Sequence, residues 1–261
     1  MIRNVNPPLA DSNSAVSRLR TPVRPPVHLD REWFHWLEGP VFDSMKIGQY
    51  DADLTRHGVA EPQGNRIVVH GNITDSDGAP VRNTLVEIWQ ANASGGYRDS
   101  LDHSGFALDP NFVGGGRCLT DDKGYYRFTT IRPGAYPAIF RDGGKAWRAS
   151  HIHFSLFGPA ASSRLITQMY FEGDPLIKLD RLINGISCPL GQDALIAKLD
   201  IEHTVSETFG PPRHFGTPDG QGGLVHPVER TDPNRLLERN PSYLAYRFDI
   251  RLRGRRSTVF E

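Results

Sequence analysis

Short segments in which apolar and polar residues alternate recur along the chain, and this two-residue period is the pattern of β-strands with one buried face. The pattern is clearest in residues 246–252, where apolar side chains take every second position and charged side chains take the positions between them. Other segments of similar length are rich in β-branched and aromatic residues, which favour strands. We therefore expect strands at residues 66–72, 84–89, 125–131, 151–157, 165–171 and 246–252.

Two short helices are expected besides the strands. Residues 31–38 follow a potential N-cap at Asp30, carry a stripe of tryptophan and leucine side chains, and stop at a Gly-Pro pair. Residues 193–199 begin with a capping aspartate and place leucine and isoleucine side chains on one face. The sequence Asp-Ser-Asp-Gly at residues 75–78 joins the first two expected strands as a turn, in which Gly78 can adopt a positive φ.

Turn residues are abundant, with 26 Gly and 20 Pro in 261 residues, and this favours many short strands over long helices. Residues 1–64 are expected to form an N-terminal arm that includes the first short helix. Residues 65–261 are expected to form one all-β domain, a β-sandwich of mainly antiparallel strands with few short helices. Within it, residues 202–240 form a long late loop rich in Gly and Pro, which we interpret as an insertion, a lid or an arm that contacts a partner.

Charge and composition exclude several classes of partner. Lys and Arg together number 30, as do Asp and Glu, so no basic excess indicates nucleic acid and no polybasic run indicates a membrane surface. No stretch of apolar residues is long enough to cross a membrane, and the N-terminal segment lacks the apolar region of a secretory signal. Two cysteines are too few for a disulfide framework, so we expect a cytoplasmic protein in a reducing compartment.

His151 and His153 are the most distinctive pair in the sequence. Because residues two apart in a strand project from the same face, the two imidazoles can bind one metal ion, although the pair alone fits two surface histidines equally well. Imidazole binds iron, copper and zinc, so the pair does not select the metal. Tyr136 lies in an expected turn before His151 and can fold back onto the strand. A phenolate beside two imidazoles favours Fe(III) over Fe(II) or Zn(II).

A series of longer motifs extends these residues, in an order that covers about half of the chain. The motifs are LVEIWQAN at residues 85–92, LDPNF at 108–112, LTD at 119–121, WR at 147–148, HIH at 151–153, LITQ at 165–168, YFEGD at 170–174 and YRFD at 246–249. Together they resemble the intradiol ring-cleavage dioxygenase family, in particular its protocatechuate 3,4-dioxygenase β-subunit type. The resemblance implies a β-sandwich that holds Fe(III) through two tyrosines and two histidines, without an organic cofactor.

The resemblance also implies roles for individual residues. Tyr136 resembles the tyrosine that leaves the iron when a catechol binds, and His151 and His153 resemble the two lasting imidazole ligands. Arg148 resembles an arginine that stabilises negative charge on the substrate ring, and Gln168 resembles a polar residue beside it. The implied reaction is cleavage of a catechol-type diol, protocatechuate or a relative, with O2 to a cis,cis-muconate. The implied assembly contains an α-type subunit or further copies of this chain.

The sequence departs from the family at one important position. When the motifs of this chain are aligned with those of the family, the position of the family's second tyrosine ligand falls at Ser104. Serine is a poor ligand for Fe(III), so an altered ligand set is expected. His103 could supply a third imidazole, another residue or water could complete the set, or the site could bind iron weakly or not at all. Two alternatives stay open: a non-catalytic subunit, and a metal enzyme that uses His103, His151 and His153.

Overall fold

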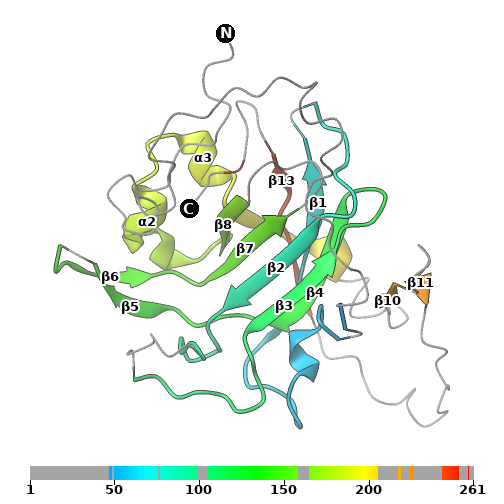
Figure 1. The fold of residues 1–261 in the computed structure, drawn as a ribbon. Coiled ribbons are helices and arrows are strands. Elements are labelled where there is room, and N and C mark those ends of the chain that lie inside the picture. Colours follow the sequence, from blue (N-terminus) through cyan, green and yellow to red (C-terminus); the bar gives the residue numbers. More distant parts are fainter. Residues whose placement is uncertain are drawn as a thin grey trace, which may run out of the picture.

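The computed structural model describes residues 47–48, 50–75, 77–98, 105–140, 142–157, 165–204, 217–218, 224–225, 243–252 and 258. Strands dominate this part of the chain, and its helices are short (Figure 1). The strands are β1 (Arg66–Thr74), β2 (Leu85–Gln90), β3 (Gly115–Leu119), β4 (Tyr125–Ile131), β5 (Tyr136–Ile139), β6 (Lys145–Arg148), β7 (His151–Phe157), β8 (Leu165–Phe171), β9 (Ile196–Asp200), β10 (Thr217–Pro218), β11 (Leu224–Val225), β12 (Leu244–Arg247) and β13 (Ile250–Arg251). The helices are η3 (Leu54–Arg56), η4 (Pro175–Leu179), α2 (Arg181–Asn184) and α3 (Pro189–Asp193), and residues 201–204 are also helical. Among these residues, no helix has the length and apolar character needed to cross a membrane.

One nine-stranded sheet makes up most of the fold. Its order is β13-β1-β12-β9-β8-β7-β2-β3, and β4 pairs with β1. Most neighbouring strands are antiparallel, whereas β1 is parallel to β12 and β13, and β8 is parallel to β9. The sheet folds over, so that β4 and β12 pack against β7 and β8 across a common core. This arrangement confirms the all-β sandwich of mainly antiparallel strands that the sequence predicts.

Strand β9 connects the two halves of the sandwich, because it pairs with β8 on one side and with β12 on the other. Its residues include most of the segment expected to be a helix at 193–199, so that prediction is wrong. Helix α3 ends at Asp193, and the chain is extended from Ile196 onwards. The reason is that backbone pairing on both edges outweighs the helical period of a short apolar run, which periodicity alone assigns poorly.

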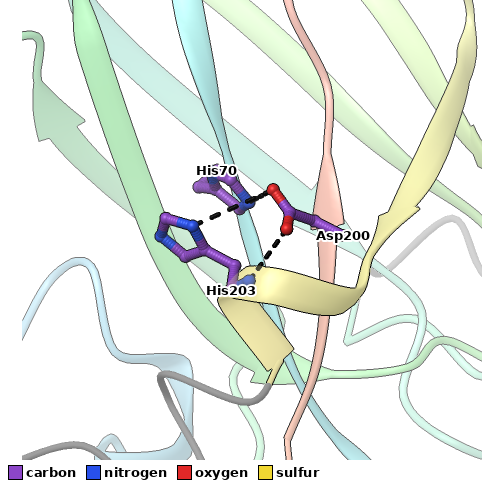
Figure 2. A group of neighbouring side chains, drawn as sticks. All are labelled: His70, Asp200 and His203. Carbon is purple, nitrogen blue, oxygen red and sulfur yellow. Dashed lines mark hydrogen bonds and ion pairs between the residues drawn. The ribbon is translucent and has the colours of Figure 1, made fainter.

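A group of polar side chains lies at the end of β9, on the face of the sheet that points away from the core. His70 of β1 belongs to this group, since its neighbour Val69 points into the core and successive residues of a strand alternate between faces. Asp200, the last residue of β9, and His203, in the helical residues 201–204, complete the group (Figure 2). His70 is buried, so the sheet carries a buried polar residue on its outer face as well as apolar residues in its core.

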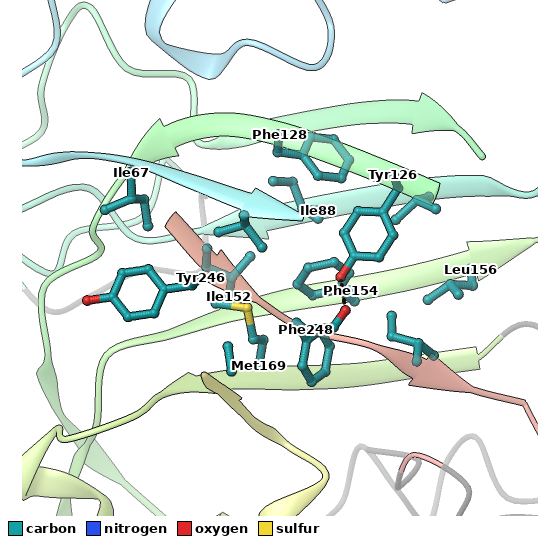
Figure 3. Packing of buried hydrophobic residues seen from close by; sticks show 14 of the residues in the cluster. Ile67, Ile88, Tyr126, Phe128, Ile152, Phe154, Leu156, Met169, Tyr246 and Phe248 are labelled. Atoms are coloured by element: carbon teal, nitrogen blue, oxygen red, sulfur yellow. Dashed lines mark hydrogen bonds between the residues drawn. The ribbon is translucent and has the colours of Figure 1, made fainter. Parts of the chain in front are cut away.

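The core between the two halves is built from aromatic and branched side chains (Figure 3). Phe154 of β7 packs against Tyr126 of β4, with ring centroids 5.7 Å apart, and against Phe248, with centroids 5.2 Å apart. The buried hydroxyl of Tyr126 donates a hydrogen bond to the carbonyl oxygen of Phe248, which satisfies the polar atom that this ring brings into the core. Leu54 of η3 is fully buried in the same cluster, so the described end of the N-terminal arm packs on the sheet.

The other strand predictions agree closely with the structure. Residues 125–131, 151–157 and 165–171 are strands with the expected bounds, and β1 and β2 lie within one or two residues of theirs. The strand expected at 246–252 is interrupted between β12 and β13. Gly78 has a φ of 88° in the expected turn, but β1 and β2, which the turn joins, do not pair with each other because they lie in opposite halves.

Some expected features lie largely outside the described residues. They are the helix at 31–38 and the loop at 202–240, of which residues 202–204 and the antiparallel pair β10 and β11 are described. The structure also contains a hairpin, β5 and β6, that the sequence analysis did not identify. This hairpin lies close to the start of β7, where the predicted metal ligands are found.

Candidate metal centre

His151 and His153 lie at the start of β7 and project from the face opposite the core. The alternate residues Ile152 and Phe154 are fully buried in the core, as the two-residue period of a strand requires. His151 is only 1% exposed, and His153 stacks on Trp89 of β2 with ring centroids 4.8 Å apart. The two imidazole rings lie edge to face, with centroids 4.9 Å apart. The structure therefore brings the predicted pair together on one face of the strand.

Tyr136 reaches the histidines from the β5–β6 hairpin. It is the first residue of β5 and not part of a turn as the sequence indicated, because its backbone pairs with that of Arg148 in β6. Its hydroxyl oxygen lies 3.4 Å from Nε2 of His151. The ring is half-buried, so the hairpin places this phenol between the buried imidazole and the solvent.

Tyr97 is a fourth member of this group, and the sequence analysis did not identify it. It lies in the loop that follows β2, and its hydroxyl oxygen is also 3.4 Å from Nε2 of His151. Its ring meets that of Tyr136 edge to face, with centroids 5.6 Å apart. Ser104, where the alignment placed a second tyrosine, and the alternative ligand His103 both lie outside the described residues.

The turn before Tyr97 was the signal that could have identified it. Residues 94–96, Ser-Gly-Gly, come soon after the last residue of β2, and a tight turn there sends the chain back toward the end of that strand. The end of β2 carries Trp89, whose partner in the register of β7 is His153. A tyrosine that follows such a turn is therefore placed near the histidine pair.

Two loops that touch through their backbones hold the two tyrosines together. The side-chain oxygen of Asn92 accepts hydrogen bonds of 3.0 Å from two backbone N–H groups of the turn before Tyr97. Gly95 in this turn has a φ of 94°, and a Cβ at this position would lie 2.8 Å from the carbonyl oxygen of Ala135. Only glycine permits both this conformation and this close approach to Ala135, in the loop that leads into Tyr136 of β5.

The buried His151 presents one ring nitrogen to both tyrosines. Its Nδ1 donates a hydrogen bond of 2.6 Å to the carbonyl oxygen of Ala149, which directs the lone pair of Nε2 toward the phenol oxygens. Burial lowers the pKa of His151 well below its ordinary value, and the nearby Arg148 and His153 lower it further. The imidazole is therefore neutral at neutral pH and can bind a cation without first losing a proton.

The two phenol oxygens lie at distances from Nε2 of His151 that ligands of one metal ion can have. Ligand atoms that are each about 2 Å from one ion lie roughly 2.8–3.4 Å from one another. The phenol oxygens of Tyr97 and Tyr136 both lie 3.4 Å from Nε2 of His151, which is at the upper end of this range. Phenols lose their protons to a metal ion of high charge, and two phenolates with two imidazoles form a donor set suited to Fe(III).

Arg148 is buried beside this group, as is Gln168. Its Nε donates a hydrogen bond of 3.0 Å to Asp180, and its Nη2 donates to the side-chain oxygen of Gln168 and, at 3.2 Å, to the hydroxyl of Tyr170. Burial alone disfavours the charged guanidinium, but the acidic groups of Tyr170, Tyr136 and Asp180 outweigh it and raise the pKa of Arg148 above its ordinary value. Arg148 is therefore a fixed cation close to Tyr136.

Asp180 is a residue of this site that the sequence analysis missed. Its buried Oδ2 accepts hydrogen bonds of 3.0 Å from Nε of Arg148 and from the backbone N–H of Ala149. Its Oδ1 accepts from the backbone N–H of Leu182 and so caps helix α2. Asp180 thus fixes Arg148 relative to α2. A helix of four residues is too short to leave a periodic signal in the sequence, so the cap could not be recognised there.

Known proteins of one family are similar to this chain. A family model described as a dioxygenase matches residues 37–254. The β chain of protocatechuate 3,4-dioxygenase from Burkholderia cepacia is 48% identical over 196 residues, which make up 74% of this chain and 81% of that protein. The α chain of protocatechuate 3,4-dioxygenase from Pseudomonas putida is 28% identical over 199 residues, 76% of each chain. Among solved structures, mercury-inhibited catechol 1,2-dioxygenase from Acinetobacter sp. ADP1 matches with a TM-score of 0.48 and 23% identity, over 77% of this chain and 56% of that one. From the family model and the β-chain relative, the chain belongs to the intradiol ring-cleavage dioxygenase family.

Proposed function

We propose that the chain is an Fe(III)-dependent intradiol dioxygenase, which cleaves a catechol-type diol with O2 to a cis,cis-muconate. The observation that carries this proposal is the convergence of two phenol oxygens, from Tyr97 and Tyr136, on Nε2 of the buried and neutral His151. Membership of the family supplies the dioxygenase role, and the β chain of protocatechuate 3,4-dioxygenase among its relatives favours an aromatic diol as substrate.

Tyr97, Tyr136, His151 and His153 are the residues that would hold the iron. Tyr97 supplies the phenol for which the alignment offered only Ser104, so the ligand set needs no substitute for a tyrosine. The support for this assignment is geometric, since the hydroxyl of Tyr97 is as close to His151 as that of Tyr136. Because this group contains two tyrosines that can bind the metal, we favour it over a site built on three histidines.

Fe(III) in this centre would supply the Lewis-acid and redox chemistry that links the diol to O2. The two tyrosines have different tasks. Tyr136 is suited to move, because it is half-buried on a two-stranded hairpin, and its released phenolate is a base for one hydroxyl proton of the diol. Tyr97 is suited to stay, because hydrogen bonds to Asn92 hold the turn before it.

Arg148 is placed to offset negative charge on the diol as its hydroxyls lose protons. A buried cation is effective in this role because little water screens it, and because its position does not change as the charge develops. The hydrogen bonds to Asp180 and Gln168 hold the guanidinium in place. Gln168 and Asp180 are therefore positioning residues, which act through Arg148.

The chain is further proposed to work in an assembly, either with an α-type subunit or with copies of itself. Its relatives include both an α chain and a β chain of protocatechuate 3,4-dioxygenase, and the β chain is the more similar of the two. Gel filtration of the chain alone and together with a separately purified α-type chain distinguishes the two assemblies. A mixed complex of defined ratio supports the first, and a defined oligomer of the chain alone supports the second.

Oxygen uptake by the iron-loaded protein tests the proposed activity. Protocatechuate, catechol and hydroxyquinol are supplied in turn, and the product is identified by chromatography. We expect a reddish protein, from charge transfer between tyrosinate and iron, that consumes one O2 for each ring-opened product formed. A colourless, iron-free preparation after growth in iron would overturn the proposal. A colourless protein that retains another metal would favour the three-histidine site, and a coloured protein inactive on every diol, alone and with an α-type chain, would favour a non-catalytic subunit.

A further inference from the structure

The polar group on the outer face of β1 and β9 contains a second set of metal-binding side chains. His70, Asp200 and His203 each offer one ligand atom, and these atoms all lie within 4.8 Å of one another. Figure 2 shows both imidazole rings and the carboxylate turned toward one another. The three residues come from other elements than the four side chains of the candidate iron centre, so this group is a separate feature of the molecule.

His70 is the buried member of this group, and Asp200 is the residue that its Nε2 approaches. The side chain of His70 is 2% exposed, and its Nε2 forms no hydrogen bond within the described part of the chain. The distance from this nitrogen to Oδ2 of Asp200 is 3.3 Å. A buried polar atom without a hydrogen bond is costly, so such an atom in a native structure calls for a ligand or another explanation. A cation between the imidazole nitrogen and the carboxylate would satisfy both.

Asp200 is held so that one oxygen faces both rings. Its Oδ1 accepts a hydrogen bond of 2.8 Å from the backbone N–H of His203, which fixes the carboxylate at the start of the helical residues 201–204. Its Oδ2 then lies 3.3 Å from Nε2 of His70 and 3.8 Å from Nδ1 of His203. These separations bracket the roughly 3.4 Å expected between ligand atoms about 2.1 Å from one tetrahedral ion.

We propose that His70, Asp200 and His203 bind a divalent transition-metal ion of the Zn²⁺ class, at a site separate from the iron centre. Two imidazoles and one carboxylate are a common ligand set for Zn²⁺, whereas hard ions such as Mg²⁺ and Ca²⁺ prefer oxygen atoms alone. Burial also keeps His70 in the neutral form that a metal requires, because it lowers the pKa of this imidazole to about 4.

Metal binding requires His203 to turn its ring. The rings of His70 and His203 are stacked, with centroids 3.9 Å apart and an angle of 16° between their planes. One ion cannot lie in the planes of two stacked rings, and imidazole binds metals in its own plane. His203 is the member that moves, because its side chain is 25% exposed while that of His70 is enclosed. Two ligands of the proposed site, His70 and Asp200, are therefore set in position, and the third, His203, rotates into place.

The position of this site in the sheet gives the ion a structural task. His70 lies on β1 and Asp200 ends β9, and β12 runs between these two strands. An ion held by both residues joins strands that are not hydrogen-bonded to each other. Strand β9 also connects the two halves of the sandwich. The ion would therefore anchor the C-terminal end of β9, and the helical residues 201–204 that follow, to β1.

Zinc binding measured by calorimetry and by metal analysis after dialysis tests this proposal. The measurement uses full-length protein in two forms: the iron-loaded wild type, and a His153→Ala variant that disables the candidate iron centre, so that the result does not depend on iron. We expect one Zn²⁺ per chain in both forms. His203→Ala and Asp200→Asn, each added to the His153→Ala variant, should weaken Zn²⁺ binding at least tenfold, since loss of even an outer partner of a ligand costs about 10–100-fold.

A matched control and a second readout make the test decisive. His57→Ala removes a histidine elsewhere, one that contacts the backbone of Tyr50, and should leave Zn²⁺ binding unchanged. Co²⁺ in place of Zn²⁺ should give the visible absorption of a tetrahedral site, which His203→Ala abolishes. The partly exposed His203 decides the outcome if Asp200→Asn fails to fold. Absence of Zn²⁺ binding in both forms, or equal losses in His57→Ala and His203→Ala, would overturn the proposal.

Discussion

Two groups of histidines lie on outer faces of the same sandwich, and they differ in how firmly their neighbours hold them. At the proposed iron centre, His151 donates one ring N–H to a backbone carbonyl, and the adjacent Arg148 is hydrogen-bonded to the buried Asp180. In the other group, Nε2 of His70 makes no hydrogen bond among the described residues, and the partly exposed ring of His203 stacks on that of His70. His151 and His70 are thus similarly buried, but the site around His151 is preorganised and the site around His70 is adaptable.

The difference matches the work proposed for each site. A catalytic centre benefits from ligands and a cation that are in place before the substrate arrives, because no reorganisation is then needed as charge develops. A structural ion can tolerate a ligand that moves on binding, because binding happens once. Both groups nevertheless depend on the same device, the alternation of a strand that sends one residue into the core and the next to the outer face.

The largest effect should follow from removing one ligand of the preorganised centre. In Tyr97→Phe, we expect iron content and O2 uptake to fall below detection, because a phenyl ring has no donor atom. Ser104→Ala is the matched control and should keep both near the wild-type level. Metal analysis and an oxygen electrode measure the two quantities. Loss of iron in Ser104→Ala with iron retained in Tyr97→Phe would show that the missing ligand lies near residue 104 and not at Tyr97.

The next largest effect concerns the buried pair behind this centre. Asp180→Asn should lower the free energy of unfolding by about 3–5 kcal/mol, because Arg148 is left as a buried cation without its counter-charge. Urea unfolding of metal-free protein measures the loss. Asp142→Asn, which removes the exposed partner of Arg181, should leave stability nearly unchanged. Equal effects of the two substitutions would mean that the centre is no more tightly constrained than the surface.

The group formed by His70, Asp200 and His203 should make the stability of the protein depend on pH. Burial, and to a smaller extent His203, lowers the pKa of His70 from 6.5 to about 4, although Asp200 opposes the shift. Between these values the unfolded chain binds a proton at His70 and the folded chain does not. The contribution of neutral His70 to the free energy of unfolding is therefore complete above pH 6.5. It is lost as the pH falls toward 4, and the total loss is about 3 kcal/mol.

His70→Gln separates this titration from that of His151, which shifts in the same direction. The difference in unfolding free energy between wild type and His70→Gln, measured without metal, should shrink or reverse by about 3 kcal/mol from pH 7 to pH 4. A difference that stays constant over this range would show that His70 titrates alike in the folded and unfolded chains.

The smallest effect should come from Arg148→Lys. Lysine keeps the charge but cannot donate to Asp180 and Gln168 in the fixed fork of a guanidinium. We expect kcat to fall roughly tenfold to a hundredfold while iron content and colour stay unchanged. Steady-state kinetics with the preferred diol measures the change. An unchanged kcat would mean that positive charge alone, without its positioning, is what the site requires.

Local pattern was sufficient to predict much of the fold. The strands at residues 125–131, 151–157 and 165–171 follow from alternation and composition, and the structure confirms their bounds. The segment 193–199 could not be predicted in the same way, because its apolar residues fit a short helix and a strand alike. Pairing with β8 and β12, distant in the sequence, makes most of it a strand.

The same distinction holds for the site residues. His151 and His153 were predictable because they lie two apart on one strand, so the strand itself places them together. The position of Tyr97 in the site depends on the path of a loop. The position of Asp180 depends on the four-residue helix α2, which it caps beside Arg148. His70 and Asp200 lie on strands far apart in the sequence, and only the order of strands in the sheet brings them within reach of each other.

The visible absorption of the protein during titration with Fe(III) reports directly on whether Tyr97 and Tyr136 bind the iron. Iron-free wild-type protein, Tyr97→Phe and Tyr136→Phe are titrated in parallel, and bound iron is measured in each. We predict a tyrosinate-to-iron band that saturates at one Fe(III) per wild-type chain, is lost with the bound iron in Tyr97→Phe, and is weakened or shifted in Tyr136→Phe. A colourless iron complex of the wild type, or a band that is unchanged in Tyr97→Phe, would contradict this prediction.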